Sequence, residues 1–282
     1  MSEILKGNVV AAKIKEEISQ KLNELKKIDK LPTLGIVRLG QNPSDISYEK
    51  SIIKNCDAIG IKSEVFEKGI ALSTEELIDF IKELNSDDNI SGILVFRPLP
   101  KHIDEDLIRS AVSPSKDVDC MHPLNLEKIF EGDMTGFLPA TPRAAMEILL
   151  HNNIELRGKN VAVINRSMVV GKPLAMMLLE KNATVTICHS RTKNLEDITR
   201  NADIVITALG KPKFFDEKYF TDKSIVIDVG VSMTKDNKIS GDVDYENVAK
   251  LVSKITPVPG GVGSVTTTIL LNQVVNACIK NN

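Results

Sequence analysis

NVAVINRSMVVGKPLAMMLLEKNATVTICHSRT, residues 160–192, is the stretch that decides the fold of this chain. An apolar run, NVAVIN, leads through a short loop into PLAMMLLEKN, which has the composition of a helix, and a second apolar run, TVTICH, follows. Parallel strands need such a crossover, because the chain must return over the sheet before it can pair in the same direction. The stretch therefore predicts a strand–helix–strand unit.

The same alternation of apolar runs and helical segments extends in both directions. Ser73 and Glu76 form a capping pattern at the start of one of these helices. The expected strands are TLGIVRLG (33–40), KSEVFEK (62–68), GILVFRPLP (92–100), DIVITAL (203–209) and SIVIDVG (224–230). Such alternation is typical of parallel sheets covered by helices, so the expected fold class is α/β.

Turn residues interrupt the alternation over roughly residues 113–142, and this interruption favours two α/β domains over one. We expect a first domain at residues 1–141 and a second, Rossmann-type NAD(P)-binding domain at 142–263. The last helix, 264–282, is apolar on more than one side and is expected to complete the first domain. A single large doubly wound sheet is the alternative.

Composition excludes several kinds of partner. The 282 residues are 42% hydrophobic and 26% charged, and the net charge of −2 gives no electrostatic reason to expect nucleic acid or an anionic membrane. The first residues carry no basic segment followed by an apolar run, and no apolar stretch is long enough to span a bilayer. Four scattered cysteines and four histidines show no metal-ligand spacing. We expect a cytoplasmic protein without a metal site.

The loop between the first strand and helix of residues 160–192 is suited to phosphate, because free amides and the helix dipole at a helix N-terminus favour anions. About twenty residues later, Rossmann domains often place an acid that holds the ribose hydroxyls of NAD. This chain has Ser190 and Arg191 there, and Arg166 in the loop. A hydroxyl and two cations suit a 2′-phosphate, so we expect NADP, with NAD possible.

A second feature is the helix that begins near SYEKSIIKNC, residues 47–56. At roughly 100° per residue, Lys50 and Lys54 point away from Tyr48, whereas Ile52 shares its face. If this helix lines a site, it supplies an aromatic hydroxyl without an amine beside it.

Three motifs link these features to a known family. They are KDVDCMHPLN (116–125), VGKP (170–173) and ITPVPGGVGSVTTT (255–268). With them, the whole chain resembles the methylenetetrahydrofolate dehydrogenase/cyclohydrolase family. The resemblance implies a folate-binding catalytic domain that faces an NADP-binding domain across a cleft. It also implies oxidation of 5,10-methylenetetrahydrofolate to the methenyl cation, hydrolysis of that cation to 10-formyltetrahydrofolate, and a homodimer.

The resemblance assigns roles to individual residues. Asp119 matches the aspartate that holds the pterin, and Tyr48 matches the tyrosine that packs beside it. A loop that approaches folate corresponds to Pro259, Gly260 and Gly263. The positions that correspond to dinucleotide contacts are Asn165, Arg166, Ser167, Gly171, Ser190, Arg191 and Val231.

Several positions depart from the family pattern. Ile52 replaces the usual lysine, the acid/base of the hydrolytic step, and Phe96 replaces the glutamine that supports it. Arg97 stands where an apolar folate contact is usual. The remaining departures are Cys120 and Asn165, each for a glycine, and Ser264-Val265 for Pro-Met.

These departures affect the two activities differently. Hydride transfer needs positioning rather than a general base, whereas hydrolysis needs a positioned acid/base, commonly worth roughly 10²–10⁴-fold in rate. The sequence therefore predicts a dehydrogenase with weak or absent cyclohydrolase activity. Two alternatives stay open: a bifunctional enzyme in which Lys50, Lys54 or Arg97 substitutes, and a catalytically silent folate- or nucleotide-binding paralogue.

Overall fold

The computed structural model describes residues 2–234, 236 and 238–281. The chain divides into two compact units, which we describe separately. The Rossmann unit comprises Met1–Ala12, Ile129–Met134 and Pro139–Thr266, and the three-stranded unit comprises Lys13–Lys128, Thr135–Leu138 and Thr267–Asn282. Two long helices, α1 (Gly7–Lys27) and α10 (Gly263–Lys280), each have their first turns in the Rossmann unit and the rest in the three-stranded unit.

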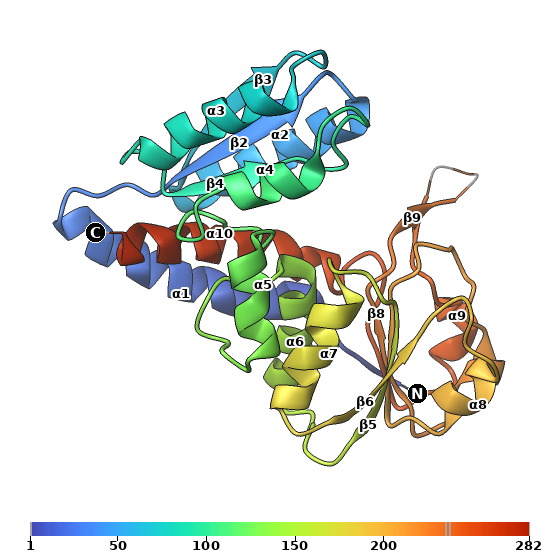
Figure 1. Cartoon of the computed structure of the whole chain (residues 1–282). Helices are drawn as coiled ribbons and strands as arrows, with labels where there is room; N and C mark the ends of the chain where they lie inside the picture. The colour runs from blue at the N-terminus through green and yellow to red at the C-terminus, as the bar shows by residue number, and fades with distance from the viewer. Residues whose placement is uncertain (1, 235, 237, 282) are drawn as a thin grey trace. The chain divides into compact units, whose positions relative to one another are not determined.

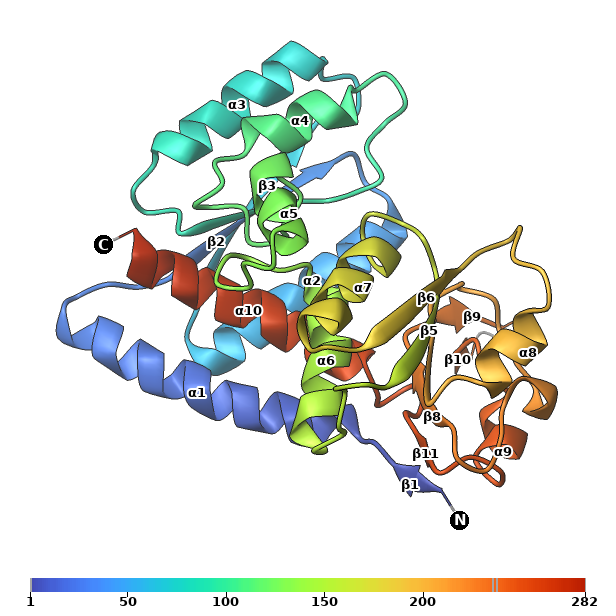
Figure 2. The same ribbon diagram turned by 60° about the horizontal axis from the view of Figure 1, so that its bottom comes forward.

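The Rossmann unit is built on a sheet that has six strands among the described residues, all paired in parallel in the order β1-β11-β8-β7-β5-β6. Helices cover both of its faces, with α6 and α7 on one side and α8 and α9 on the other (Figures 1 and 2). Its strands are β1 (Glu3–Ile4), β5 (Asn160–Ile164), β6 (Thr184–Cys188), β7 (Ile204–Thr207), β8 (Ile225–Asp228) and β11 (Lys254–Ile255), beside a separate antiparallel pair of β9 (Ser232–Met233) and β10 (Ile239–Ser240). The helices are α6 (Ala140–His151), α7 (Gly171–Glu180), α8 (Leu195–Arg200), α9 (Tyr245–Val248) and the 3-10 turn η1 (Glu217–Tyr219).

The three-stranded unit has a parallel sheet in the order β3-β2-β4. Its strands are β2 (Thr33–Leu39), β3 (Lys62–Lys68) and β4 (Gly92–Val95), and its helices are α2 (Pro43–Ile59), α3 (Thr74–Ser86), α4 (Glu105–Ala111) and α5 (Pro123–Phe130). Strands β2 and β4 are almost fully buried, as expected for a parallel sheet covered by helices. The capping box of Ser73 and Glu76 at the start of α3 is confirmed.

The α/β fold class and the longer strands are confirmed, and the alternative of a single doubly wound sheet is wrong, because two separate parallel sheets form. Elements of two residues, such as β1 and β11, were not predicted, since two residues carry no periodicity. Helix α5 is not predicted either, because its eight residues lie among the turn residues of the expected linking region.

The compact units assign the N-terminal residues differently from the expected domains. Residues Met1–Ala12 lie in the Rossmann unit, because β1 pairs with β11 and the amide of Gly7 donates to the carbonyl of Gly260 at 2.8 Å. A side chain at Gly7 would place its Cβ 2.0 Å from the carbonyl oxygen of Gly261. The close approach of these two backbones therefore requires a residue without Cβ at position 7.

A buried ion pair fixes helix α2 against the sheet of the three-stranded unit. The Arg38 guanidinium, on β2, lies 2.7 Å from the Glu49 carboxylate on α2 and 2.9 Å from Glu67 on β3. The Arg38 and Glu49 side chains are only 4% and 10% exposed. Hydrogen bonding to Glu49, opposed by burial, raises the pKa of Arg38 further above its usual value. Helix α2 carries Tyr48, so this pair helps to set the position of that side chain.

We expect Glu49→Ala to lower the free energy of unfolding by about 3–5 kcal/mol, because it leaves a buried guanidinium without its nearest charge partner. Urea unfolding measures this loss. The matched control is Asp79→Ala, which breaks the exposed pair of Asp79 with Lys82 and should cost about 0–1 kcal/mol. Equal effects of the two substitutions would show that the buried pair does not anchor α2.

Candidate functional site

Strand β5, which lies between β6 and β7, marks the place where the strand order of the Rossmann unit reverses. Strand β6 pairs with one side of β5 and β7 pairs with the other, and Ile164 is in register with both Cys188 and Thr207. The chain segments that follow β5 and β7 therefore depart to opposite sides of the sheet. In open α/β sheets, ligands bind at the carboxyl ends of the strands at such a point.

Asn165 directly follows β5 and holds this place together. Its side-chain oxygen accepts from the amides of Ser167 at 2.8 Å and Gly171 at 3.1 Å, while its nitrogen donates to the carbonyl of Ala208 at 2.6 Å. Since Ala208 follows β7, one carboxamide ties together the two diverging segments. It also occupies two loop amides that a glycine at this position would leave for a phosphate.

Glycine is required at position 171, where helix α7 begins. A Cβ there would lie 2.0 Å from the carbonyl oxygen of Asn165, so any side chain would force the loop away from the helix. Gly171 thus has a packing role in the loop. Its predicted contact with the dinucleotide, like that of Asn165, stays a prediction.

The predicted phosphate-binding residues lie at the same edge of the sheet. Arg166 and Ser167 are exposed and follow β5, and Ser190 and Arg191 are exposed and follow the adjacent strand β6. The amide of Arg191 donates to the His189 ring at 3.1 Å, which fixes the backbone of this segment. Because Ile164 and Cys188 are paired, Arg166 and Ser190 each lie two residues beyond one rung of the ladder.

Two buried aspartates shape the segment that carries Val231. Asp228, at the end of β8, accepts from the Thr207 hydroxyl and from the amides of Gly230 and Val243, and Asp242 accepts from the amide of Lys211. Burial raises the pKa of Asp228 to about 6, and the nearby charge of Asp242 also raises it. Val231 follows this network and is 58% exposed. No sequence pattern distinguishes these two acids, since each resembles an ordinary turn residue.

The loop predicted to approach folate also belongs to the Rossmann unit. Gly260 has a φ of +101°, a conformation that favours glycine, and Gly261 would place a Cβ 2.4 Å from the carbonyl oxygen of Pro257. Open space surrounds the missing side chain of Gly263, and Pro259 is exposed. The tight turn explains Gly260, whereas Gly263 leaves its backbone accessible.

The other predicted folate residues lie in the three-stranded unit, at the carboxyl end of β4 and on α2. The rings of Tyr48 and Phe96 lie 5.5 Å apart, centroid to centroid, at 34°. Tyr48 is 45% exposed and Phe96 is 8% exposed. Ile52, one turn after Tyr48, is completely buried, while Lys50 and Lys54 are exposed. The helical geometry inferred from the sequence is confirmed, and position 52 faces the core rather than the surface.

Arg97 and Asp119 form the charged part of this cluster. The guanidinium Nη2 of Arg97 lies 2.9 Å from Oδ2 of Asp119, and Nη1 lies 3.7 Å from Glu105. Burial raises the pKa of Asp119, the charge of Arg97 opposes this change, and the charge of Asp117 adds to it. Burial, with a smaller contribution from Asp119, raises the pKa of Tyr48 to about 12. The four side chains at positions 48, 96, 97 and 119 therefore form one cluster.

Asp117 positions this cluster and was not singled out in the sequence. It is fully buried, and its carboxylate accepts from the amides of Met121 and His122, both at 2.9 Å, and from the side chain of Asn125 at 2.8 Å. Asp117 also forms a parallel bridge with Ile93 of β4. The signal for Asp117 is the KDVD motif itself, which has two aspartates separated by one residue.

Cys120 replaces a usual glycine, and the structure shows why glycine suits this position. Its φ is +55°, which lies in the left-handed region, and its side chain is buried. Burial raises the pKa of its thiol, so this cysteine stays protonated at neutral pH.

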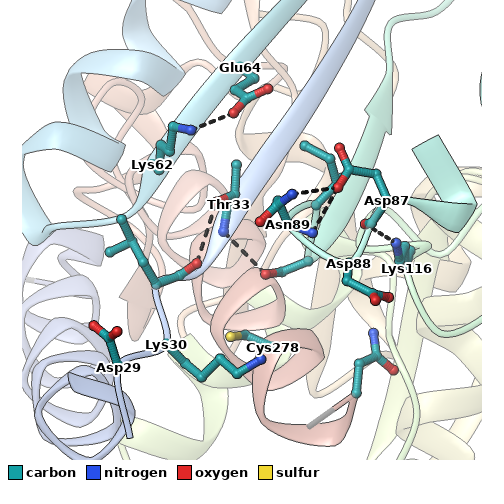
Figure 3. A pocket seen from close by; sticks show the side chains of 14 residues that line it. Asp29, Lys30, Thr33, Lys62, Glu64, Asp87, Asp88, Asn89, Lys116 and Cys278 are labelled. Atoms are coloured by element: carbon teal, nitrogen blue, oxygen red, sulfur yellow. Dashed lines mark hydrogen bonds and ion pairs between the residues drawn. The ribbon is translucent and has the colours of Figure 1, made fainter. Parts of the chain in front are cut away.

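A separate cavity of about 920 Å³ opens at the amino ends of β2, β3 and β4 in the three-stranded unit (Figure 3). Several of its polar side chains pair with one another or with the backbone: Lys62 contacts Glu64 at 2.6 Å, and Lys116 donates to the Asp87 carbonyl at 2.7 Å. It lies at the opposite strand ends from the predicted site residues, so we assign it no ligand.

Metal sites and membrane-spanning helices are both absent from the described residues. Within residues 2–234, 236 and 238–281, no group of three or more His, Cys, Asp and Glu side chains could hold a metal ion. Over the same described residues, no helix has the length and apolar character needed to cross a membrane.

Comparison with known proteins matches the chain to two domains of one protein family. Residues 5–119 match the catalytic domain of tetrahydrofolate dehydrogenase/cyclohydrolase, and residues 139–282 match its NAD(P)-binding domain. Bifunctional protein FolD of Clostridium botulinum is 54% identical to this chain over 282 residues, which cover 100% of both proteins.

Solved structures agree with the sequence comparison. The bifunctional FolD enzyme of Campylobacter jejuni, a methylenetetrahydrofolate dehydrogenase/cyclohydrolase, has a TM-score of 0.97 and 41% identity, covering 100% of both chains. The corresponding Trypanosoma brucei protein, solved with NADP and an inhibitor, has a TM-score of 0.92 and 31% identity over 99% of this chain and 98% of that one.

We expect Asn165→Ala to loosen the loop after β5, because it removes the three hydrogen bonds of the carboxamide and leaves the Ala208 carbonyl without that donor. The free energy of unfolding should fall by about 1–3 kcal/mol. Amide hydrogen exchange should quicken at residues 165–171 specifically. Asn152→Ala, which removes one carboxamide bond at the end of α6, is the control and should leave exchange in that loop unchanged. Unchanged exchange in the Asn165 variant would contradict the bridging role.

Proposed function

Because this chain belongs to the tetrahydrofolate dehydrogenase/cyclohydrolase family, we propose that it oxidises 5,10-methylenetetrahydrofolate to the 5,10-methenyl cation with NADP as hydride acceptor. We propose further that it hydrolyses that cation weakly or not at all. The family and the NAD(P)-binding domain predicted from the motifs are confirmed. NADP preference, the roles of individual residues and the loss of hydrolysis are the proposal.

The dehydrogenase step does not require a side chain that takes up or releases a proton. Hydride leaves the methylene carbon with its electron pair, and the resulting cation is delocalised over two nitrogens, so no side chain has to remove a proton from that carbon. Positioning and electrostatics carry such a step. In the proposal, Asp119 accepts hydrogen bonds from the pterin, and the Tyr48 ring packs beside it. Arg166, Ser167, Ser190 and Arg191 surround the phosphates of NADP.

Hydrolysis makes a demand that this cluster does not meet. Water must lose a proton as it attacks, and a leaving nitrogen must gain one. Ile52 and Phe96 carry no group that takes or gives a proton, and Ile52 is buried. Tyr48, with its pKa raised to about 12, keeps its proton at neutral pH and is no base there. The burial of an isoleucine at position 52 is the observation that carries this part of the proposal.

A bifunctional enzyme is the second candidate, and one observation favours it. The 54% identical Clostridium botulinum relative is named a bifunctional protein. For this chain, that candidate needs another acid/base. Lys50 and Lys54 are exposed on the other side of α2 from Ile52, and Arg97, paired with Asp119, keeps its proton and is a poor base.

One experiment separates these candidates from a catalytically silent protein. Purified protein is given 5,10-methylenetetrahydrofolate and NADP, and formation of reduced nicotinamide is followed by absorbance. Hydrolysis of added methenyltetrahydrofolate is followed separately. Absence of both activities would leave a binding protein, and two comparable rates would establish the bifunctional enzyme. The proposal also places the protein in the cytoplasm. It further takes the protein to be a homodimer, and sedimentation equilibrium tests this by measuring the mass of the assembly.

We expect kcat/KM to be higher with NADP than with NAD. The residues that can pair with a 2′-phosphate are Arg166 after β5 and Ser190 and Arg191 after β6, and no acid follows β6 to hold the ribose hydroxyls of NAD. Arg166→Ala should lower kcat/KM for NADP about tenfold or more while changing the value for NAD little, since only NADP carries the extra charge. Steady-state kinetics with both cofactors measures this. The control is Arg157→Ala, an exposed arginine outside the loop. Equal efficiency with NAD would remove the basis of the assignment.

We expect the wild type to accelerate hydrolysis of methenyltetrahydrofolate little above the buffer rate. Ile52→Lys alone should restore little and should destabilise the protein, because it buries a charge without a partner. The double change Ile52→Lys, Phe96→Gln should restore more activity than the two single changes combined, as coupled catalytic groups are non-additive. Hydrolysis is followed by loss of methenyl absorbance.

The control for that series is Ile53→Lys, which places an amine at the neighbouring, partly exposed position of α2. It should restore no hydrolysis. A wild-type protein that hydrolyses the cation about as fast as it forms it would show that another group of this chain supplies the proton chemistry.

A further inference from the structure

Arg97 is a charged residue of the three-stranded unit that departs from the family pattern. It directly follows Phe96 at the end of β4, and its guanidinium contacts Asp119 at 2.9 Å. The side chains of Arg97 and Asp119 are 22% and 26% exposed, so neither charge is fully screened by water. An arginine in this position therefore changes the chemistry of the carboxylate beside it.

The contact between the two side chains uses one carboxylate oxygen. Nη2 of Arg97 donates to Oδ2 of Asp119, and the second terminal nitrogen, Nη1, is directed at Glu105 at 3.7 Å. Among the described residues, no hydrogen bond is formed to Oδ1 of Asp119. With Oδ2 paired to Arg97, Oδ1 is the oxygen of the carboxylate that is fully open to a ligand.

The surroundings of Asp119 oppose its ionisation. Burial raises the pKa of its carboxyl, and the negative charge of Asp117 acts in the same direction. The other titratable groups that face it are the Tyr48 phenol and the Cys120 thiol, which are neutral at neutral pH. Arg97 is the nearby cation, and it also faces Glu105. An adjacent cation commonly lowers a carboxyl pKa by about 1–3 units, so loss of Arg97 would protonate Asp119 more readily.

We propose that Arg97 is a positioning residue that keeps Asp119 ionised and holds its Oδ2, so that Oδ1 alone accepts a hydrogen bond from the folate. This inference rests on the proposed function, in which Asp119 binds the pterin. Folate is then recognised through one oxygen of Asp119 rather than two. The arginine compensates for the partly buried surroundings of the acid and occupies one acceptor site of Oδ2.

The test measures binding of tetrahydrofolate by calorimetry over a series of pH values that follows the loss of affinity as Asp119 becomes protonated. Removal of Arg97 raises the pKa of Asp119. As the pH is lowered, the variant therefore loses the ionised form that binds folate at a higher pH than the wild type does. For Arg97→Leu, the pH below which affinity falls should therefore move up by about one unit or more. Arg97→Lys, which keeps a cation, should show a smaller movement.

Two further variants show whether Arg97 acts through Asp119. Asp119→Asn has no carboxyl to titrate, so its weaker binding should not depend on pH in this range. Adding Arg97→Leu to Asp119→Asn should produce no further change in the pH profile, which is the coupling expected when one residue acts through another. Arg157→Leu removes an exposed arginine from the Rossmann unit and serves as the control, with a wild-type profile. Binding of NADP, measured on every variant, reports that the protein is folded.

The possible outcomes are distinct. A pH profile for Arg97→Leu that matches the wild type, with NADP binding intact, overturns the positioning role but leaves the proposed function standing. Tighter tetrahydrofolate binding by Arg97→Leu at every pH also overturns it, because Arg97 would then compete with folate for Asp119. A wild-type protein that binds NADP but neither binds nor oxidises a reduced folate overturns the proposed function and this inference together. Should Arg97→Leu fail to fold, Arg97→Gln decides by the same profile.

Discussion

Parallel pairing of strands is the constraint on which both groups of candidate residues depend. When strands run in the same direction, their carboxyl ends meet at one edge, and the segments that follow them are brought together although they are distant in the sequence. In the Rossmann unit, this edge collects the segments that follow β5, β6 and β8. In the three-stranded unit, the bridge between Ile93 and Asp117 extends the same parallel arrangement beyond β4, so Asp119 lies beside Arg97.

Each edge is then held by polar side chains that hydrogen-bond to the backbone of the segments they join. Asn165 joins the segments after β5 and β7, Asp228 fixes the segment before Val231, and Asp117 folds the turn that carries Asp119. Their hydrogen bonds give partners to backbone groups of these segments. The exposed residues can therefore vary in charge and shape while the backbone that presents them stays in place.

The cluster around Tyr48 shows how such variation changes chemistry. An apolar side chain at position 52 is buried in the core, and an aromatic ring at position 96 packs against Tyr48. The charge of this cluster resides instead in Arg97 and Asp119, which neutralise one another at 2.9 Å. A pair of this kind suits recognition of a polar ligand edge more than transfer of a proton, because the guanidinium does not release its proton at neutral pH.

The amino-acid sequence by itself determined the α/β class, the longer strands and the face of α2 on which Ile52 lies, because these follow from periodicities that a single segment displays. It also determined the family, since the motifs KDVD, VGKP and PVPGGVG are recognised from the order of residues alone, without knowledge of any tertiary contact. Only the tertiary structure decided what those residues touch. The pairing of β1 with β11, the bridge from Asn165 to Ala208 and the ion pair of Arg97 with Asp119 join residues from about 20 to 250 positions apart. No local pattern encodes such contacts, because they depend on which strands become neighbours and on which side chains burial leaves without water.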